Sequence, residues 1–433
     1  MSIRYVSTRG TAPAVSLSEA IRDGVAPDGG LYLPEEIPRA DLSALDGDIP
    51  LAAFAHAMLA PFFAGDRLEA ALPAICAAAF DFPVPAVAFD PSRPTVRALE
   101  LFHGPTGAFK DFGARFLMGC FERLGDPAAP LTVLVATSGD TGGAVGCAAE
   151  ARDALRAFIL YPRGRVSAFQ EAQLGCWGAP VHALEVDGNF DDCQRLVKAA
   201  FADRELSARH NLTSANSINI ARLLPQMAYL AAASMRAFAD DGAEPGLVIP
   251  TGNLGHGFAA VYARATGFPI GPIVAATNAN RTLHDWHRSG NYMPGPSVAT
   301  IANAMDVGAP SNFERLSHME AGARGIVVDR VEDAAIRARI AADFGLHGYP
   351  WCPHSAAAAE AHARLDPAFE AERGWLIAAT AHPYKFADIV EPLTGRPVEP
   401  PPALARIADL PANKKPIAAD LGSLRAALEA ADR

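Results

Sequence analysis

From about residue 130 onward, short apolar runs alternate with glycine-containing loops and helical patterns. A strand whose residues are all apolar is buried on both faces, which is typical of a parallel sheet whose strands are connected by helices. The pattern therefore predicts an α/β fold with mainly parallel sheets covered by helices on both faces. In such sheets, ligands bind at the carboxyl ends of the strands. The apolar runs lie at 132–136, 158–161, 246–250, 273–276, 326–328 and 375–379.

The first 90 residues differ from this pattern. They contain a turn signal at 27–30 and two helical patterns, at 17–24 and 51–63. A proline-rich stretch follows at 83–94 and predicts a domain boundary, because proline and glycine interrupt regular structure. We therefore expect a separate N-terminal domain over residues 1–90 and a second region over residues 91–433.

The charge and the cysteines restrict the partners of the chain. A formal net charge of -11 argues against nucleic-acid and anionic-membrane partners, because both need a basic face. No apolar run reaches the roughly 20 residues of a membrane span, and the N-terminus lacks a signal-peptide core, which predicts a cytoplasmic protein. No CxxC pair occurs, so we expect free thiols. The cysteines are at 76, 120, 147, 176, 193 and 352.

Lysine is rare in this chain and occurs only at positions 110, 198, 385, 414 and 415. Arginine can replace lysine where only positive charge is needed, but it cannot form a Schiff base. Lys110 lies among aromatic residues after a Gly/Pro-rich loop, and burial there favours a neutral, nucleophilic amine. The alternative is a surface lysine that extends its amine into water. Lys198 is expected on a solvated helix face, and Lys414 and Lys415 in a polar tail.

Two glycine-rich loops follow predicted strands, at 138–143 and 252–257. Each precedes a helical pattern, and a helix N-terminus binds anions through its free N–H groups and dipole. Neither loop matches the dinucleotide or Walker pattern. Taken alone, each could be an ordinary turn. Together they suggest two phosphates, or one phosphate and one carboxylate.

Several segments, in order along the chain, together resemble the threonine synthase family. They are 5–10, 27–32, 102–106 with 109–111, 136–142, 216–219 with Arg222 and Gln226, 310–315 and 379–383. The resemblance covers nearly the whole chain, and the joint match is far more specific than any single motif. It implies a fold-type II pyridoxal 5′-phosphate (PLP) enzyme, similar to the tryptophan synthase β subunit, with an added N-terminal α+β domain. Residues 91–433 would then form two α/β subdomains with the active site between them.

The resemblance also implies which residues bind the cofactor. Lys110 would carry PLP as a Schiff base, the loop after residue 250 would hold its phosphate, Thr380 would face the pyridine nitrogen and Asp140 the phenolic oxygen. The implied cofactor-binding residues are Lys110, Asp140, Gly252, Asn253, Leu254, Gly255, His256 and Thr380. The substrate phosphate would be held by Ser138, Thr141, Asn216, Ser217 and Arg222.

The implied reaction converts O-phospho-L-homoserine and water to L-threonine and phosphate, with Lys110 as cofactor carrier and general base. A related lyase would release 2-oxobutyrate, ammonia and phosphate from the same substrate. A homologue that binds phosphorylated metabolites without catalysis is a further alternative, and retention of Lys110, Thr380 and Arg222 argues against it. We expect a monomer or a homodimer that binds a small-molecule substrate.

Some positions depart from the family pattern. Leu254 and His256 stand where the family has Phe and Asn, Arg281 replaces an Asp, and residues 302–306 read Ala-Asn-Ala-Met-Asp in place of Ser-Pro-Ser-Met-Asp. His103 is either a substrate contact or a structural histidine. His284 and His287 are expected on a polar helix face, and we predict no metal site.

Overall fold

The structure is a computed structural model and describes residues 3–42, 45, 48–137, 139–319 and 325–431. Its larger sheet has the strand order β11-β10-β9-β12-β4-β3, in which only the short edge strand β3 runs antiparallel to its neighbour. These strands are β3 (Ala86–Val87), β4 (Val96–Glu100), β9 (Gly246–Pro250), β10 (Ile273–Thr277), β11 (Ile326–Arg330) and β12 (Trp375–Ala379).

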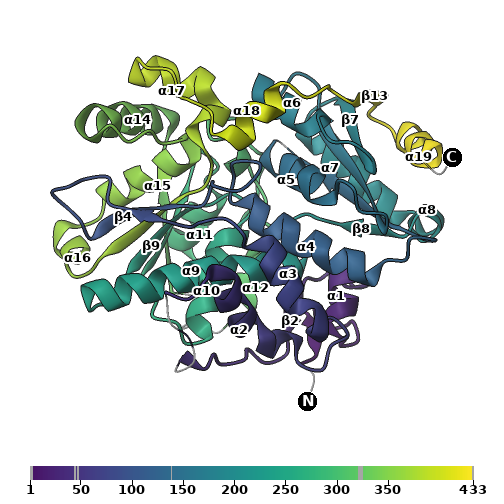
Figure 1. The fold of residues 1–433 in the computed structure, drawn as a ribbon, viewed down its shortest axis with the longest axis horizontal. Coiled ribbons are helices and arrows are strands. Elements are labelled where there is room, and N and C mark those ends of the chain that lie inside the picture. Colours follow the sequence, from purple (N-terminus) through teal and green to yellow (C-terminus); the bar gives the residue numbers. More distant parts are fainter. Residues whose placement is uncertain (1–2, 43–44, 46–47, 138, 320–324, 432–433) are drawn as a thin grey trace.

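The second sheet is entirely parallel, with the order β13-β7-β6-β5-β8. Figure 1 shows the two sheets in separate lobes, with the N-terminal elements packed beneath both. The strands of the second sheet are β5 (Leu131–Ala136), β6 (Leu155–Pro162), β7 (Val181–Asp187), β8 (Leu212–Ser214) and β13 (Lys414–Ala418).

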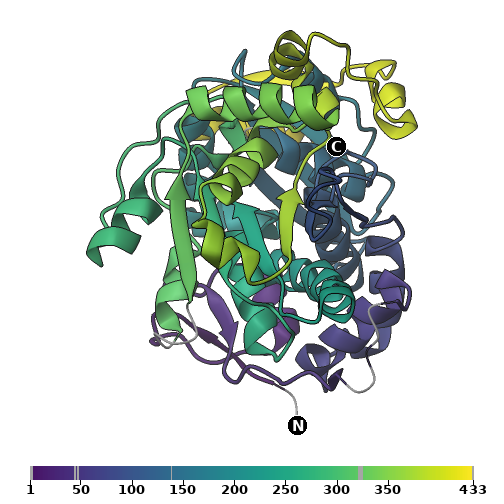
Figure 2. The same cartoon turned by 90° about the vertical axis from the view of Figure 1, so that its left-hand side faces the viewer.

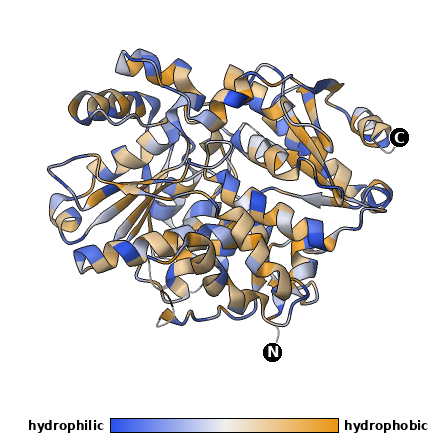
Figure 3. Cartoon of the chain, viewed as in Figure 1, coloured by the Kyte–Doolittle hydropathy of each residue, from blue (hydrophilic) through white to orange (hydrophobic). Residues whose placement is uncertain are grey.

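Helices cover both faces of each sheet, as the uninterrupted apolar runs predict. In β5, Val133 and Val135 belong to one buried cluster and Leu134 and Ala136 to another, so side chains on both faces are buried. The central strands of both sheets are accordingly mostly hydrophobic in Figure 3. The predicted α/β architecture is confirmed, although β3, β4, β7, β8 and β13 were not identified from the sequence.

The N-terminal segment packs β1 (Tyr5–Ser7) antiparallel to β2 (Tyr32–Pro34), beside three helices at the base of the molecule in Figures 1 and 2. These helices are α1 (Leu17–Asp23), α2 (Leu51–Phe63) and α3 (Leu72–Ala79), preceded by the 3-10 turn η2 (Glu69–Ala71). Strand β3 lies within residues 1–90 but pairs with β4 of the larger sheet. The exact domain boundary stays a prediction.

The remaining helices connect and cover the strands. They are α4 (Lys110–Leu124), α5 (Asp140–Ala149), α6 (Ala168–Gly175), α7 (Phe190–Ala202), α8 (Arg204–Arg209), α9 (Ile220–Asp241), α10 (Gly255–Ala265), α11 (Thr282–Ser289), α12 (Phe313–His318), α14 (Asp333–His347), α15 (Pro353–Ala363), α16 (Pro367–Ala371), α17 (Ala387–Thr394), α18 (Pro402–Ala408) and α19 (Leu421–Ala430), with 3-10 turns η3 (Asn303–Met305) and η4 (Pro383–Phe386). Among the described helices, none is both long and apolar enough to cross a bilayer.

The predicted polar tail around Lys414 and Lys415 is wrong, because these residues open strand β13 at the edge of the second sheet. Lys414 forms ion pairs with Glu171 and Glu185. The local sequence is polar because only one residue of this edge strand, Ile417, is buried. Lys198 is exposed on α7, as predicted, and all six cysteines are free thiols.

Candidate active site

Lys110 is the first residue of α4, after the loop that leaves β4. Its amine lies 4.6 Å from the centroid of the Phe109 ring and makes no hydrogen bond or ion pair with any residue that the structure describes. Burial and the Arg222 charge lower the pKa of Lys110 to about 8, while the Asp140 carboxylate opposes this shift. The amine is therefore neutral above about pH 8, whereas an exposed lysine stays charged to beyond pH 10.

The loop 252–256 links β9 to the N-terminus of α10. Leu254 precedes the helix with a φ of 61°, a left-handed conformation that is strained for a residue with a branched side chain. This conformation lets the first N–H groups of α10, which have no partner within the helix, point out of its end. The loop is therefore shaped to receive an anion.

His256, in the first turn of α10, provides an independent sign of a missing partner. Its side chain is 5% exposed, and neither ring nitrogen has a hydrogen-bond partner among the described residues. The ring stacks on Phe109 at 4.6 Å between centroids and meets the edge of Tyr229 at 5.6 Å. Burial and the Lys110 charge lower the pKa of His256 to about 3, so the imidazole is neutral. A buried N–H without an acceptor is costly, which fits a site completed by a phosphate.

Thr380 follows β12 and lies against the Lys110 loop. Its N–H donates to Ser355 Oγ at 2.9 Å, and its carbonyl accepts from the N–H of Phe109 at 2.8 Å. The side chain is 4% exposed, and within the described part of the chain its hydroxyl has no partner. A free hydroxyl in this buried place fits a ring nitrogen of a ligand.

The residues predicted to bind the substrate phosphate lie beside this loop. Ser217 Oγ accepts from Asn253 Nδ2 at 2.6 Å, so the two predicted anion sites are in direct contact. Arg222 is 2% exposed on α9; its Nη1 donates to the Ala215 carbonyl, and its Nε has no partner in the described structure. Asn216 Oδ1 is likewise buried and unpaired. Thr141 is the second residue of α5, and Ser138 lies outside the described residues.

Asp140 has a partner that the sequence did not reveal. Its Oδ1 lies 3.0 Å from Lys385 Nζ and accepts from Gln170 Nε2 at 3.2 Å. Burial alone would raise the pKa of Asp140, but the charge and hydrogen bond of Lys385 lower it below its usual value. Asp140 is therefore an ionised carboxylate within a buried ion pair.

Arg315, which sequence reasoning did not single out, supports the loop 215–219, which carries the predicted substrate ligands Asn216 and Ser217 and is called the substrate loop below. This fully buried side chain on α12 donates to the carbonyls of Ser217 and Ile218 and of Tyr32, and to Asn312 Oδ1. It thereby connects the N-terminal segment to the substrate loop. Its place in the segment 310–315, which carries part of the family resemblance, could have identified it from the sequence.

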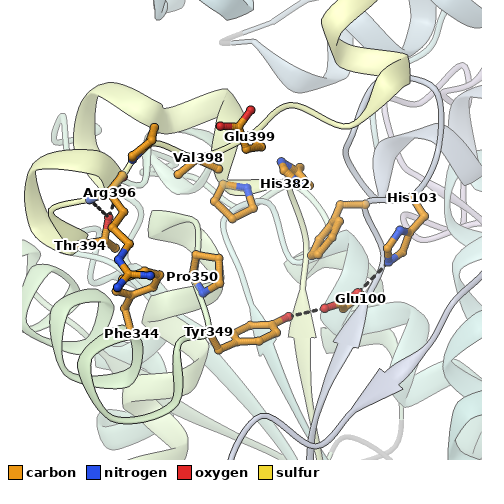
Figure 4. A pocket seen from close by; sticks show the side chains of 13 residues that line it. Glu100, His103, Phe344, Tyr349, Pro350, His382, Thr394, Arg396, Val398 and Glu399 are labelled. Atoms are coloured by element: carbon orange, nitrogen blue, oxygen red, sulfur yellow. Dashed lines mark hydrogen bonds and ion pairs between the residues drawn. The ribbon is translucent and has the colours of Figure 1, made fainter.

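His103 lines a separate cavity of about 380 Å³ (Figure 4), whose lining residues do not include Lys110, Asp140 or Arg222. Its Nε2 lies 2.7 Å from Glu100 Oε2, and the other carboxylate oxygen accepts from the Tyr349 hydroxyl at 2.8 Å. These contacts favour the structural interpretation of His103.

Comparison with known proteins decides the family. Residues 95–380 match the model of pyridoxal-phosphate dependent enzymes, and residues 4–80 match the threonine synthase N terminus. The chain is 37% identical over 422 residues to a threonine synthase of Serratia marcescens, with 95% of each chain covered, and 37% identical over 424 residues to that of Escherichia coli, with 95% of this chain and 96% of the relative covered. The chain belongs to the threonine synthase family.

Solved structures of the family share the whole fold. The Escherichia coli threonine synthase superposes with a TM-score of 0.88 at 33% identity, over 99% of this chain and all of the other. A PLP-bound threonine synthase from Brucella melitensis gives 0.90 at 33% identity, over the full length of both chains. The predicted fold type and the predicted cofactor PLP are confirmed. The roles of individual residues in the site remain our assignments.

Proposed function

We propose that this member of the threonine synthase family converts O-phospho-L-homoserine and water to L-threonine and phosphate, with PLP on Lys110. The observation that carries the proposal is the unpaired, half-buried amine of Lys110 next to the cationic side chain of Arg222 and the unpaired imidazole of His256. Three features argue against a non-catalytic homologue: the lysine that would carry the cofactor is present, Arg222 provides a cation for binding an anion, and the family match spans the full chain.

The described residues fit PLP at three points. The α10 N-terminus with Gly255 and His256 accounts for the cofactor phosphate, Thr380 for the pyridine nitrogen and Lys110 for the aldehyde carbon. The loop that replaces the family's Phe and Asn by Leu254 and His256 keeps its free N–H groups, so the substitutions are compatible with phosphate binding. Bound PLP supplies an electron sink that stabilises negative charge on the substrate carbons.

Lys110 Nζ is the base that removes a proton from the substrate α carbon and later returns one to it. Its pKa of about 8 gives a larger neutral fraction near neutral pH than an exposed lysine has. One amine thus both carries the cofactor and moves the proton.

Arg222, Ser217, Asn216 and Thr141 bind the phosphate of the substrate and stabilise the charge that accumulates as it leaves. The guanidinium of Arg222 is held by the Ala215 carbonyl through Nη1, and its buried Nε has no partner among the described residues. Departure of phosphate from the γ carbon also requires loss of a proton from the β carbon. A proton then adds to the γ carbon, and water supplies the hydroxyl at the β carbon.

Product analysis tests the proposal against the lyase alternative. The enzyme is incubated with O-phospho-L-homoserine in heavy-oxygen water, and the products are quantified by mass spectrometry. We expect labelled threonine and phosphate in near equal amounts. Phosphate release with mainly 2-oxobutyrate and ammonia would overturn the synthase assignment.

A monomeric or homodimeric state and a cytoplasmic location stay predictions, and light scattering after size-exclusion chromatography tests the first.

A further inference from the structure

We propose that Lys385 is a positioning residue that pairs with Asp140 and so leaves the amine of Lys110 free to react. The inference rests on the proposed role of Lys110 as the cofactor lysine. It concerns why, of two neighbouring lysines, only one is available to an aldehyde.

Lys385, on η4 after β12, is held by three acceptors. Its Nζ lies 2.7 Å from the Thr106 carbonyl, 2.6 Å from Gln173 Oε1 and 3.0 Å from Asp140 Oδ1, and the side chain is completely buried. An ammonium group has three protons to donate, so every one is used. Lys385 is therefore a fixed charge with no proton left to offer a ligand.

Lys110 has the opposite environment, since its amine has no acceptor in the described structure. Asp140 is nonetheless close enough for its charge to act on Lys110. A carboxylate that paired with a buried amine would keep that amine protonated, and a protonated amine is not a nucleophile. By engaging Asp140, Lys385 prevents this competing pair.

Lys385 also stabilises the loop that presents Lys110. The Thr106 carbonyl accepts from both Lys385 and Gln173, while the N–H and hydroxyl of Thr106 donate to Asp111 at 2.9 and 2.6 Å. This loop ends at Lys110, so Lys385 sets the position of the reactive amine as well as its electrostatic surroundings.

The other titratable groups are accounted for on each neighbouring element. Arg222 on α9 acts on Lys110, and the Lys110 charge acts on His256 of α10 and His354 of α15. The Lys385 charge acts on Asp111 and His382. Burial lowers the pKa of His256, His354 and His382 to about 3, 4 and 4, so all three are neutral near pH 8. Substituting Asp140 or Lys385 therefore changes the net charge next to Lys110, whereas these histidines contribute none at that pH.

The test follows the rate of visible Schiff-base absorption when PLP is added to full-length apoprotein between pH 6 and 10. The rate rises with the neutral fraction of Lys110, so its midpoint reports the pKa of that amine. Lys385→Met leaves Asp140 unpaired beside Lys110 and should raise the midpoint by about one unit. Asp140→Asn leaves an unpaired cation and should lower it. The double variant should return near the wild-type value, and Lys385→Arg should stay close to it.

Opposite shifts that cancel in the double variant are not expected from a purely structural role. Equal midpoints in all variants, or shifts of the same sign in both single variants, would overturn the inference. If Lys385→Met does not fold, Lys385→Gln replaces it, and a midpoint that does not rise in that variant would overturn the inference. Borohydride reduction and peptide mapping separate the two claims, because wild-type label on a lysine other than Lys110 would refute the proposed function instead.

Discussion

At the residue scale, the site is defined by polar atoms that lack partners. Lys110, Thr380 and His256 each present a buried or half-buried polar atom with no acceptor or donor in the described structure. Folded proteins rarely leave such atoms unpaired, because each costs about 1–3 kcal/mol. Their convergence at the ends of β4, β9 and β12 identifies where a ligand must complete the hydrogen bonding.

Lys110→Ala should abolish the covalent link to PLP, because alanine has no amine. Some non-covalent PLP should remain through the α10 N-terminus, visible as absorption of the free aldehyde that is lost on dialysis. The wild-type protein should be yellow, and borohydride should fix the label on Lys110. Lys198→Ala, at an exposed position of α7, is the control and should leave absorption and turnover unchanged.

Arg222→Ala should raise KM for O-phospho-L-homoserine roughly ten- to a hundredfold, as expected for a lost charge-assisted hydrogen bond worth about 1.5–3 kcal/mol. Since the Arg222 charge lowers the pKa of Lys110, that pKa should also rise, and PLP incorporation should need higher pH. Steady-state kinetics and the absorption spectrum check both effects. Arg195→Ala, at an exposed site on α7, is the control. Loss of PLP without a change in KM would mean that the two anion sites were assigned the wrong way round.

At the element scale, strand-to-helix junctions supply most of the chemistry. A parallel strand delivers its following loop to the same edge of the sheet as its neighbours, so loops distant in sequence converge there. The β9–α10 junction shows how much local strain this can include, since Leu254 keeps a left-handed backbone conformation at the start of the helix.

His256→Phe preserves the stack on Phe109 but removes both ring nitrogens. We expect the dissociation constant of PLP to rise about tenfold, the range for one hydrogen bond to an anion, with little change in the melting temperature. Because the pKa of His256 is about 3, its imidazole is already neutral above pH 5, so the ratio of affinities should not vary between pH 6 and 9. Equilibrium titration of PLP measures it. His182→Phe, which alters a similar stack on Phe158 in the other sheet, should have no effect.

At the scale of the whole molecule, the N-terminal segment and the catalytic region share one core. The largest buried cluster contains residues of both, and Arg315 bonds Tyr32 on one side and Ser217 on the other. The N-terminal segment therefore supports the substrate loop directly.

Arg315→Met should lower the free energy of unfolding by at least about 3 kcal/mol, because it leaves several buried acceptors without a donor. It should also raise KM for the substrate, since the carbonyls of Ser217 and Ile218 lose their support. Urea denaturation and kinetics measure the two effects. Arg337→Met, exposed on α14, should change neither. If the Arg315→Met variant is destabilised but keeps a normal KM, Arg315 stabilises the fold without positioning the substrate loop.

The sequence by itself determined the α/β class, the family, the cofactor and the loops that form the site. It could do so because both signals are local. A strand buried on both faces is a run of consecutive apolar residues, and an anion-binding loop contains closely spaced glycines. The segments that carry the resemblance likewise placed Lys110, Arg222, Thr380 and the 252–256 loop, which the structure brings together.

Only the tertiary structure decided which side chains pair. The Asp140–Lys385 ion pair, the link from Arg315 to Ser217 and the addition of β13 to β7 join residues far apart in the chain. A carboxylate, a lysine or a polar edge strand has no local signature of its partner, because charge pairing and edge pairing depend on geometry in three dimensions. In the sequence, nothing distinguished Lys385 as a partner for Asp140 among the five lysines. In the fold, it is the lysine that forms the ion pair with Asp140.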